Sequence, residues 1–131
     1  MKKRGLSTEE SILNLVDQFM SASIKKDSRF MHLYLHPKFL FATPRGTLFN
    51  YDTFFNDFLL NEKLRLLTFE RLEQHVVLVP GLGLMNGIVK AQFLDAEEQF
   101  ERISFLWVPT SSNWSLLQIH STFTTSALQI L

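Results

Sequence analysis

The side chain of this sequence best suited to acid–base chemistry is that of His120, because an imidazole gains and loses a proton near neutral pH. Leu116 and Gln118 precede it at intervals of two residues, so in a β-strand the three side chains lie on one face. A second series with the same interval consists of Ile103, Phe105 and Trp107. Two interpretations of His120 follow: a general acid–base beside a bound molecule, or a partly buried residue that hydrogen-bonds a first-helix group or the backbone. Gln118 is correspondingly either a polar contact to a ligand or the structural partner of His120.

Other residues have suitable chemistry but lack suitable surroundings. His32 and His36 have the i, i+4 spacing of two metal ligands on a helix, but Pro37 disfavours helical geometry at His36, and no third ligand is evident. The glycines at positions 81 and 83 separate two predicted strands, whereas a phosphate-binding loop joins a strand to a helix. The chain has no cysteine, which excludes thiol chemistry. We therefore predict no metal site and no cofactor.

Length and composition define the class of protein that must position these side chains. The chain has 131 residues, of which 46% are apolar and 20% are charged, so we predict one globular domain over residues 1–131. Its 13 Lys and Arg balance its 13 Asp and Glu, which leaves no basic field for nucleic acid or an anionic membrane. No segment approaches the ~20 apolar residues of a membrane helix. No apolar stretch follows the basic start Met1–Arg4, so we expect a cytoplasmic protein.

The first part of the chain carries helix signals. Ser7 to Glu10 form a capping box, and apolar residues then recur at the helical period as far as Ile24. A second, short helix is predicted from an Asp27 cap through Leu35, and Pro37 ends it. These two helices should each bury one face.

A strand over 39–43, a turn at 44–46 and a short hairpin partner over 47–50 come next. A third helix, capped by Asn50 or Asp52, follows the hairpin. Its buried side consists of Phe54, Phe55, Phe58 and Leu59.

The second half of the chain changes to a period of two residues, which is typical of strands. The predicted strands cover 65–79, 84–94, 99–109 and 113–123. Helices followed by a run of strands indicate an α+β fold, with helices on one face of an antiparallel sheet. Strands this long must coil, so the sheet should be strongly curved and have a concave face. The charged residues Glu97, Glu98, Glu101 and Arg102 suggest a solvated hairpin end.

The order of these elements resembles that of the nuclear transport factor 2-like superfamily, which includes ketosteroid isomerase, SnoaL-like cyclases and the association domain of a calcium/calmodulin-dependent kinase. Three matches carry the resemblance: the segment 35–46, the pair Trp107 and Trp114, and the ending 114–122. It implies a cone-shaped, cystatin-like fold whose helices close over an apolar pocket. The implied pocket residues are Phe19, Phe41, Thr43, Phe58, Ile103, Phe105, Trp107, Leu116, Gln118 and His120.

The resemblance does not extend to isomerase chemistry. That reaction needs a carboxylate base and two donors around an oxyanion. The corresponding positions in this chain are Thr43 for the base, and Phe19 and Ile103 for the donors. None of the three can supply the required group. We find no clear counterpart of the pocket Asp of the SnoaL-like cyclases either.

Three hypotheses about function remain. The first is a dimeric domain that binds a small hydrophobic molecule. The second is an enzyme of the isomerase, lyase or cyclase kind that uses His120. The third is a self-associating module like the kinase association domain, although Phe105 stands where that domain commonly has an arginine.

We also expect a homodimer formed through the convex face of the sheet, because the helices cover only the other face. The apolar positions expected there are Val76 and Leu78 or Val77 and Val79, together with Leu117 and Ile119. A wet apolar patch of that size would favour self-association.

Overall fold

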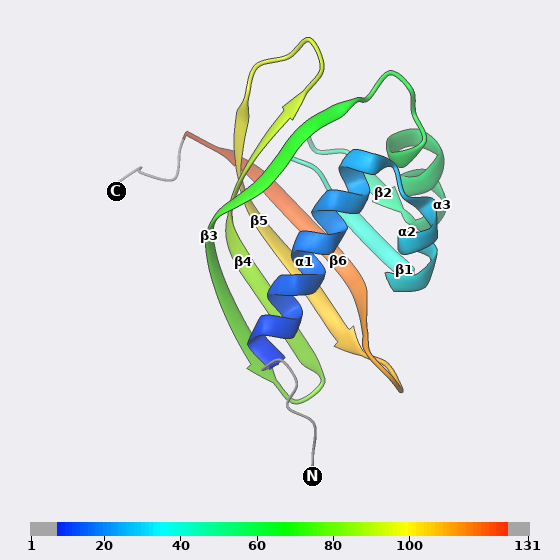
Figure 1. The fold of residues 1–131 in the computed structure, drawn as a ribbon, viewed down its shortest axis with the longest axis vertical. Coiled ribbons are helices and arrows are strands. Elements are labelled where there is room, and N and C mark those ends of the chain that lie inside the picture. The colour runs from blue at the N-terminus through cyan, green and yellow to red at the C-terminus, as the bar shows by residue number, and fades with distance from the viewer. Residues whose placement is uncertain (1–7, 126–131) are drawn as a thin grey trace.

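The computed structural model describes residues 8–125, in which helices pack on one face of a curved six-stranded sheet (Figure 1). α1 (Thr8–Lys25) lies diagonally across the sheet and buries an apolar side that includes Ile12, Val16 and Phe19. Its Asp17 carboxylate accepts two hydrogen bonds from Arg71 of the sheet, at 2.6 and 2.8 Å. The first residue of the predicted capping box lies outside the described residues.

The two short helical segments begin at the predicted caps. Asp27 accepts a hydrogen bond from the backbone of Phe30 and caps α2 (Ser28–Tyr34). Asn50 caps α3 (Tyr51–Thr53), whose Thr53 hydroxyl accepts from the Asn50 backbone. The third helix then widens into a π-helix, η1 (Phe54–Leu59), where an α-helix was expected. π-Helical turns of this kind occur often at functional sites.

The strands are β1 (Leu35–Ala42), β2 (Leu48–Asn50), β3 (Leu66–Val79), β4 (Leu82–Phe93), β5 (Gln99–Pro109) and β6 (Trp114–Thr124). Their order across the sheet is β2-β1-β6-β5-β4-β3. The last four strands form the predicted antiparallel meander, and this confirms the α+β class.

β1 differs from the expectation in two respects. It pairs with β6 in parallel, so the sheet is mixed rather than wholly antiparallel. It also begins at Leu35 instead of residue 39 and contains Pro37. Proline has no backbone N–H to donate, and Pro37 falls where the β1–β6 register is interrupted, between Leu35 and Leu40. The proline therefore ends the helix as predicted but does not prevent a strand.

A β-bulge at Leu117 changes which side chains of β6 face the helices. Gln118 pairs with Leu106, and Leu116 pairs with Trp107, so Leu117 is the extra residue. An extra residue in one strand shifts the two-residue alternation beyond it. Leu116 and Ile119, three positions apart, are consequently both buried on the concave side.

Aromatic rings fill the space between the helices and the sheet. Phe54 is fully buried at their centre. Its ring centroid lies 5.3 to 6.3 Å from those of Phe39, Phe58, Phe55, Phe41 and Phe19. No helix within residues 8–125 is long and apolar enough to cross a membrane.

Candidate functional site

A cavity of about 460 Å³ lies between the helices and the concave face of the sheet. It is found where the β1–β2 turn, the β4–β5 turn and the segment before β3 meet, at the upper end of the molecule in Figure 1. Most of its lining is apolar. The rings and aliphatic side chains that line it include Phe19, Phe41, Phe49, Phe58, Leu66, Phe69, Ala91, Phe93, Ile103, Ile119 and Phe123.

The structure brings half of the sequence-predicted pocket residues to this cavity. Those that line it are Phe19, Phe41, Thr43, Phe58 and Ile103. Phe105, Trp107 and Leu116 are buried without lining it. They form the packed core beneath the cavity. Within residues 8–125, the Trp107 indole Nε1 is a buried polar atom without a hydrogen-bond partner.

Gln118 and His120 do not reach the cavity. Both are exposed, and their cross-strand partners Leu106 and Ser104 lie on the convex face of the sheet. The bulge at Leu117 is the physical reason, because it reverses the alternation on which their inward placement was predicted. The acid–base group identified from sequence thus lies on the face opposite the cavity.

The carboxylate that does line the cavity is Glu101, so its predicted place at a solvated hairpin end is wrong. Its residue is only 6% exposed. The Ser121 hydroxyl donates to Oε1 at 2.5 Å, and the Gln99 amide donates to Oε2 at 2.6 Å. The signal was present in the sequence, since Glu101 lies two residues before Ile103 in the inward series of β5.

Two hydroxyl groups of the cavity lining make local hydrogen bonds. The Ser23 hydroxyl donates to the Phe19 carbonyl at 2.9 Å, and the Thr43 hydroxyl accepts from the backbone of Thr47. Arg45 and Lys63 also line the cavity, but both are exposed. The Arg45 guanidinium lies over the ring of Phe123, 5.3 Å from its centroid.

One lysine fixes the segment that borders the cavity. Lys26 ends α1 in a left-handed conformation, with φ of 55°. Its ammonium donates to the carbonyls of Leu59, Asn61 and Leu64 at 2.7, 3.1 and 3.0 Å. These contacts join the end of α1 to the end of η1 and to the segment before β3.

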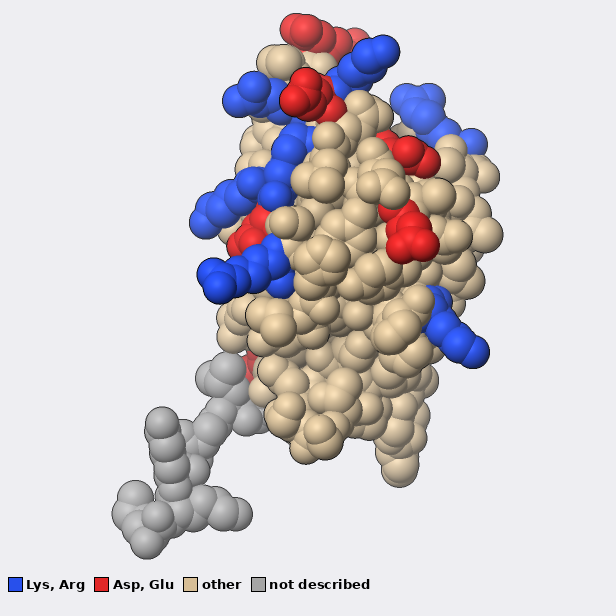
Figure 2. Space-filling model, turned by 90° about the vertical axis from the view of Figure 1, so that its right-hand side faces the viewer, with Lys and Arg blue, Asp and Glu red and all other residues tan. Residues whose placement is uncertain are grey.

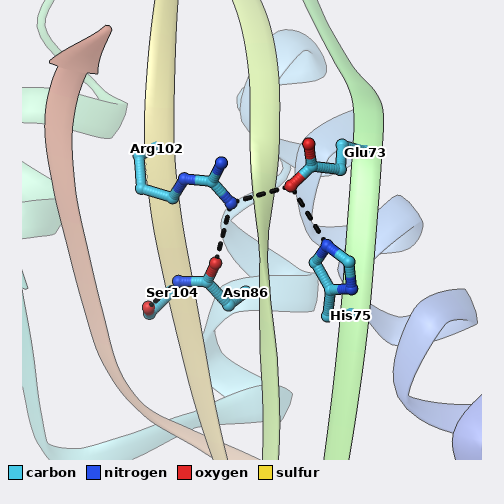
Figure 3. Close-up of polar contacts among 5 residues, drawn as sticks. All are labelled: Glu73, His75, Asn86, Arg102 and Ser104. Atoms are coloured by element: carbon cyan, nitrogen blue, oxygen red, sulfur yellow. Dashed lines mark hydrogen bonds and ion pairs between the residues drawn. The ribbon is translucent and has the colours of Figure 1, made fainter. Parts of the chain in front are cut away.

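The convex face of the sheet carries a polar network across β3, β4 and β5 (Figure 3). The Arg102 guanidinium donates to Glu73 at 2.8 Å and to the Asn86 carbonyl oxygen at 3.0 Å, and Asn86 donates to the Ser104 hydroxyl. The hydrogen bond from Arg102 holds the pKa of the Glu73 carboxyl below its usual range. His75 also contacts this carboxylate, at 3.1 Å.

Beside this network, part of the convex face is apolar. Val77 and Val79 are 51% and 50% exposed. The cross-strand partner of Val77 is Leu84, which in turn pairs with Leu106, so these side chains are neighbours on one face. Val76 and Leu78 pack against the core, so of the two predicted pairs Val76 and Leu78 is wrong; Ile119 is buried in the core, so its predicted place on this face is also wrong.

The side of the molecule that carries α2 and α3 has its charges around the upper part and few over the rest (Figure 2). His32 lies in this region, where its ring stacks on Phe55 and contacts the Tyr51 hydroxyl at 3.0 Å. His36 lies in β1 and accepts from the backbone of Lys38. The two histidines therefore do not form a pair, and residues 8–125 contain no group of three potential metal ligands.

The sequence matches no family model and no curated protein. Solved structures do resemble the fold. An NTF2-like protein from Cytophaga hutchinsonii superposes with a TM-score of 0.84 at 15% identity, over 91% of this chain and 100% of the other. A putative Ca/calmodulin-dependent kinase II association domain from Exiguobacterium sibiricum superposes with a TM-score of 0.82 at 13% identity, over 95% of this chain and 99% of the other. A Caulobacter vibrioides protein with a cystatin-like fold superposes with a TM-score of 0.69 at 12% identity, over 89% of this chain and 89% of the other.

These likenesses, together with the helix-covered curved sheet, show that the chain has the NTF2-like fold. The predicted resemblance is confirmed at that level. A fold of this kind serves unrelated activities, so function has to be argued from the site.

Proposed function

We propose that this chain binds a small, mainly apolar molecule in the cavity that opens between η1, the β1–β2 turn and the β4–β5 turn. The observation that carries the proposal is the cavity itself: about 460 Å³ of space lined mostly by aromatic and aliphatic side chains. Cavities that hold small ligands typically have volumes of ~300–1,000 Å³ and apolar walls with a few polar groups. Glu101 supplies such a polar group here.

The proposal does not include ketosteroid isomerase chemistry. Phe19, Thr43 and Ile103 line the cavity, and none of them can act as the base or as an oxyanion donor of that reaction. His120 cannot act on a molecule in the cavity, because it lies on the opposite face. We expect a Δ5-3-ketosteroid assay to show no turnover above buffer.

The test of the cavity is to fill it. Ala91 lines the cavity from β4 and is 3% exposed, so Ala91→Phe places a ring in the proposed ligand space. We expect binding of 2-phenylethanol, followed by amide chemical shifts, to weaken at least tenfold. The variant should remain folded, because overpacking costs ~1–3 kcal/mol even where no space exists.

Leu33→Phe is the matched control, because Leu33 is 74% exposed on α2 and does not line the cavity. Binding by this control should equal that of the unaltered chain. A folded Ala91→Phe variant that binds 2-phenylethanol as well as the control would contradict the proposal.

A second candidate function is self-association, and the exposed apolar part of the convex face favours it. Val77 and Val79 lie there beside Leu84, next to the network around Glu73. The kinase association domain with a similar fold adds support by analogy. We propose that two copies of the chain pair through this face, with the apolar residues in contact and the polar network beside them.

This dimer can be tested with Val77→Glu, because a charge at the centre of an apolar contact loses its water without gaining a partner. By light scattering at micromolar concentration, the unaltered chain should have twice the mass of one chain, and Val77→Glu should have the mass of one. Leu33→Glu introduces the same charge on α2 and should stay dimeric. A monomeric unaltered chain would refute the dimer and leave the cavity proposal untouched.

A further inference from the structure

Glu101 combines burial with the lack of a positive partner among residues 8–125. Its residue is 6% exposed, yet the ion pairs among residues 8–125 join other carboxylates: Asp17, Glu70, Glu73 and Glu98. Its two hydrogen bonds come from neutral groups, the Ser121 hydroxyl and the Gln99 amide. These donors orient the carboxylate but do not cancel its charge. A buried carboxylate is costly unless a cation compensates it.

The carboxylate also has hydrogen-bonding capacity to spare. Each of its two oxygens can accept about two hydrogen bonds, and each accepts one from the protein. The group lines the cavity, so the remaining lone pairs are available to a molecule bound there. An ammonium group has three hydrogen-bond donors and one positive charge, so it can both compensate the charge of the carboxylate and donate to its remaining lone pairs.

The rest of the lining suits the other end of such a molecule. Phe93 and Phe123 line the cavity on β4 and β6, the two strands that flank the strand of Glu101, and Phe69 lines it on β3, beyond β4. Aromatic faces attract cations and also bury apolar groups. Arg45 and Lys63, the other charged residues of the lining, are exposed, so water and salt screen them.

We infer that the cavity selects small apolar amines, with the ammonium group on Glu101 and the hydrocarbon part among the phenylalanine rings. This inference rests on the proposed ligand-binding function and specifies the chemical class of its ligand. Ser121 and Gln99 are positioning residues, which hold the carboxylate toward the cavity.

The experiment compares three probes of one shape: 2-phenylethylamine, 2-phenylethanol and phenylacetate, titrated at pH 7 in about 0.15 M salt. We expect the amine to bind about tenfold or more tightly than the alcohol, since charged hydrogen bonds are substantially stronger than neutral ones. The anion should bind most weakly. In Glu101→Gln, which keeps size and loses charge, the preference for the amine should disappear while alcohol binding changes less than about threefold.

Glu98→Gln is the matched control, because Glu98 is an exposed carboxylate in the same hairpin and outside the lining. It should keep the preference for the amine. Equal affinity of the unaltered chain for amine and alcohol, tighter binding of phenylacetate, or an unchanged preference in Glu101→Gln would overturn the amine inference alone. Binding of none of the three probes would overturn the cavity proposal as well. The comparison of probes on the unaltered chain decides the matter even if Glu101→Gln does not fold.

Discussion

Replacing Phe54 by alanine should lower the free energy of unfolding by about 3–5 kcal/mol, the range for removing a buried aromatic ring. Phe54 is fully buried, and its ring touches five other phenylalanine rings. Three of those rings, Phe19, Phe41 and Phe58, line the cavity, although Phe54 itself does not. The substitution therefore removes the support behind the cavity wall. Urea unfolding should record this loss of free energy. Thermal unfolding should show a fall in Tm of roughly 10–20 °C.

Phe123→Ala makes the same chemical change at a ring that is 46% exposed. Its cost should stay below about 1.5 kcal/mol, because less apolar surface returns to water. Phe54→Leu, which keeps most of the volume, should fall between the two variants. If Phe54→Ala were no more costly than Phe123→Ala, the central role of Phe54 in the core would be wrong.

The second large effect is expected at Lys26. Lys26→Met keeps the length of the side chain but removes the donors to the carbonyls of Leu59, Asn61 and Leu64. Hydrogen bonds to charged groups are each worth ~1.5–3 kcal/mol and are not additive, so we expect a total loss of about 2–4 kcal/mol. Both residues would adopt the same left-handed conformation, so backbone strain largely cancels in the comparison.

Lys25→Met is the control, because Lys25 is exposed and precedes Lys26 directly. Surface changes of this kind usually alter stability by less than ~0.5 kcal/mol. Hydrogen exchange adds a local readout: amides between η1 and β3 should lose protection in Lys26→Met and keep it in Lys25→Met. Identical stability and exchange in the two variants would show that the three hydrogen bonds contribute nothing.

The elements of this fold follow from local patterns, whereas the site depends on relations between strands. Asp27 and Asn50 cap helices as predicted, because capping involves residues two or three positions apart. The long strands end within three residues of their predicted limits, because clusters of turn residues separate them. The parallel pairing of β1 with β6 was not predicted, because it joins segments far apart in the chain.

The two principal errors at the site have different physical causes. The two-residue alternation predicted inward side chains for Gln118 and His120, but the Leu117 bulge interrupts it. No residue type in that segment indicates a bulge. Glu101 was missed because its charge was given more weight than its position in an inward-facing series. Strand period identified its neighbour Ile103 correctly, so the same rule applied without regard to charge would have found Glu101.

The Leu117 bulge also bears on how a cavity of this kind can change during evolution. Deleting that one residue would remove the bulge and leave Leu116, Gln118 and Ile119 opposite Trp107, Leu106 and Phe105, so the side chains beyond it would keep their present faces. Glu101 would keep the Ser121 hydroxyl that orients it, and His120 would stay on the opposite face. A single codon gained or lost at this point of the strand can thus be absorbed by the bulge, so the cavity keeps its chemical character while the length of the strand changes.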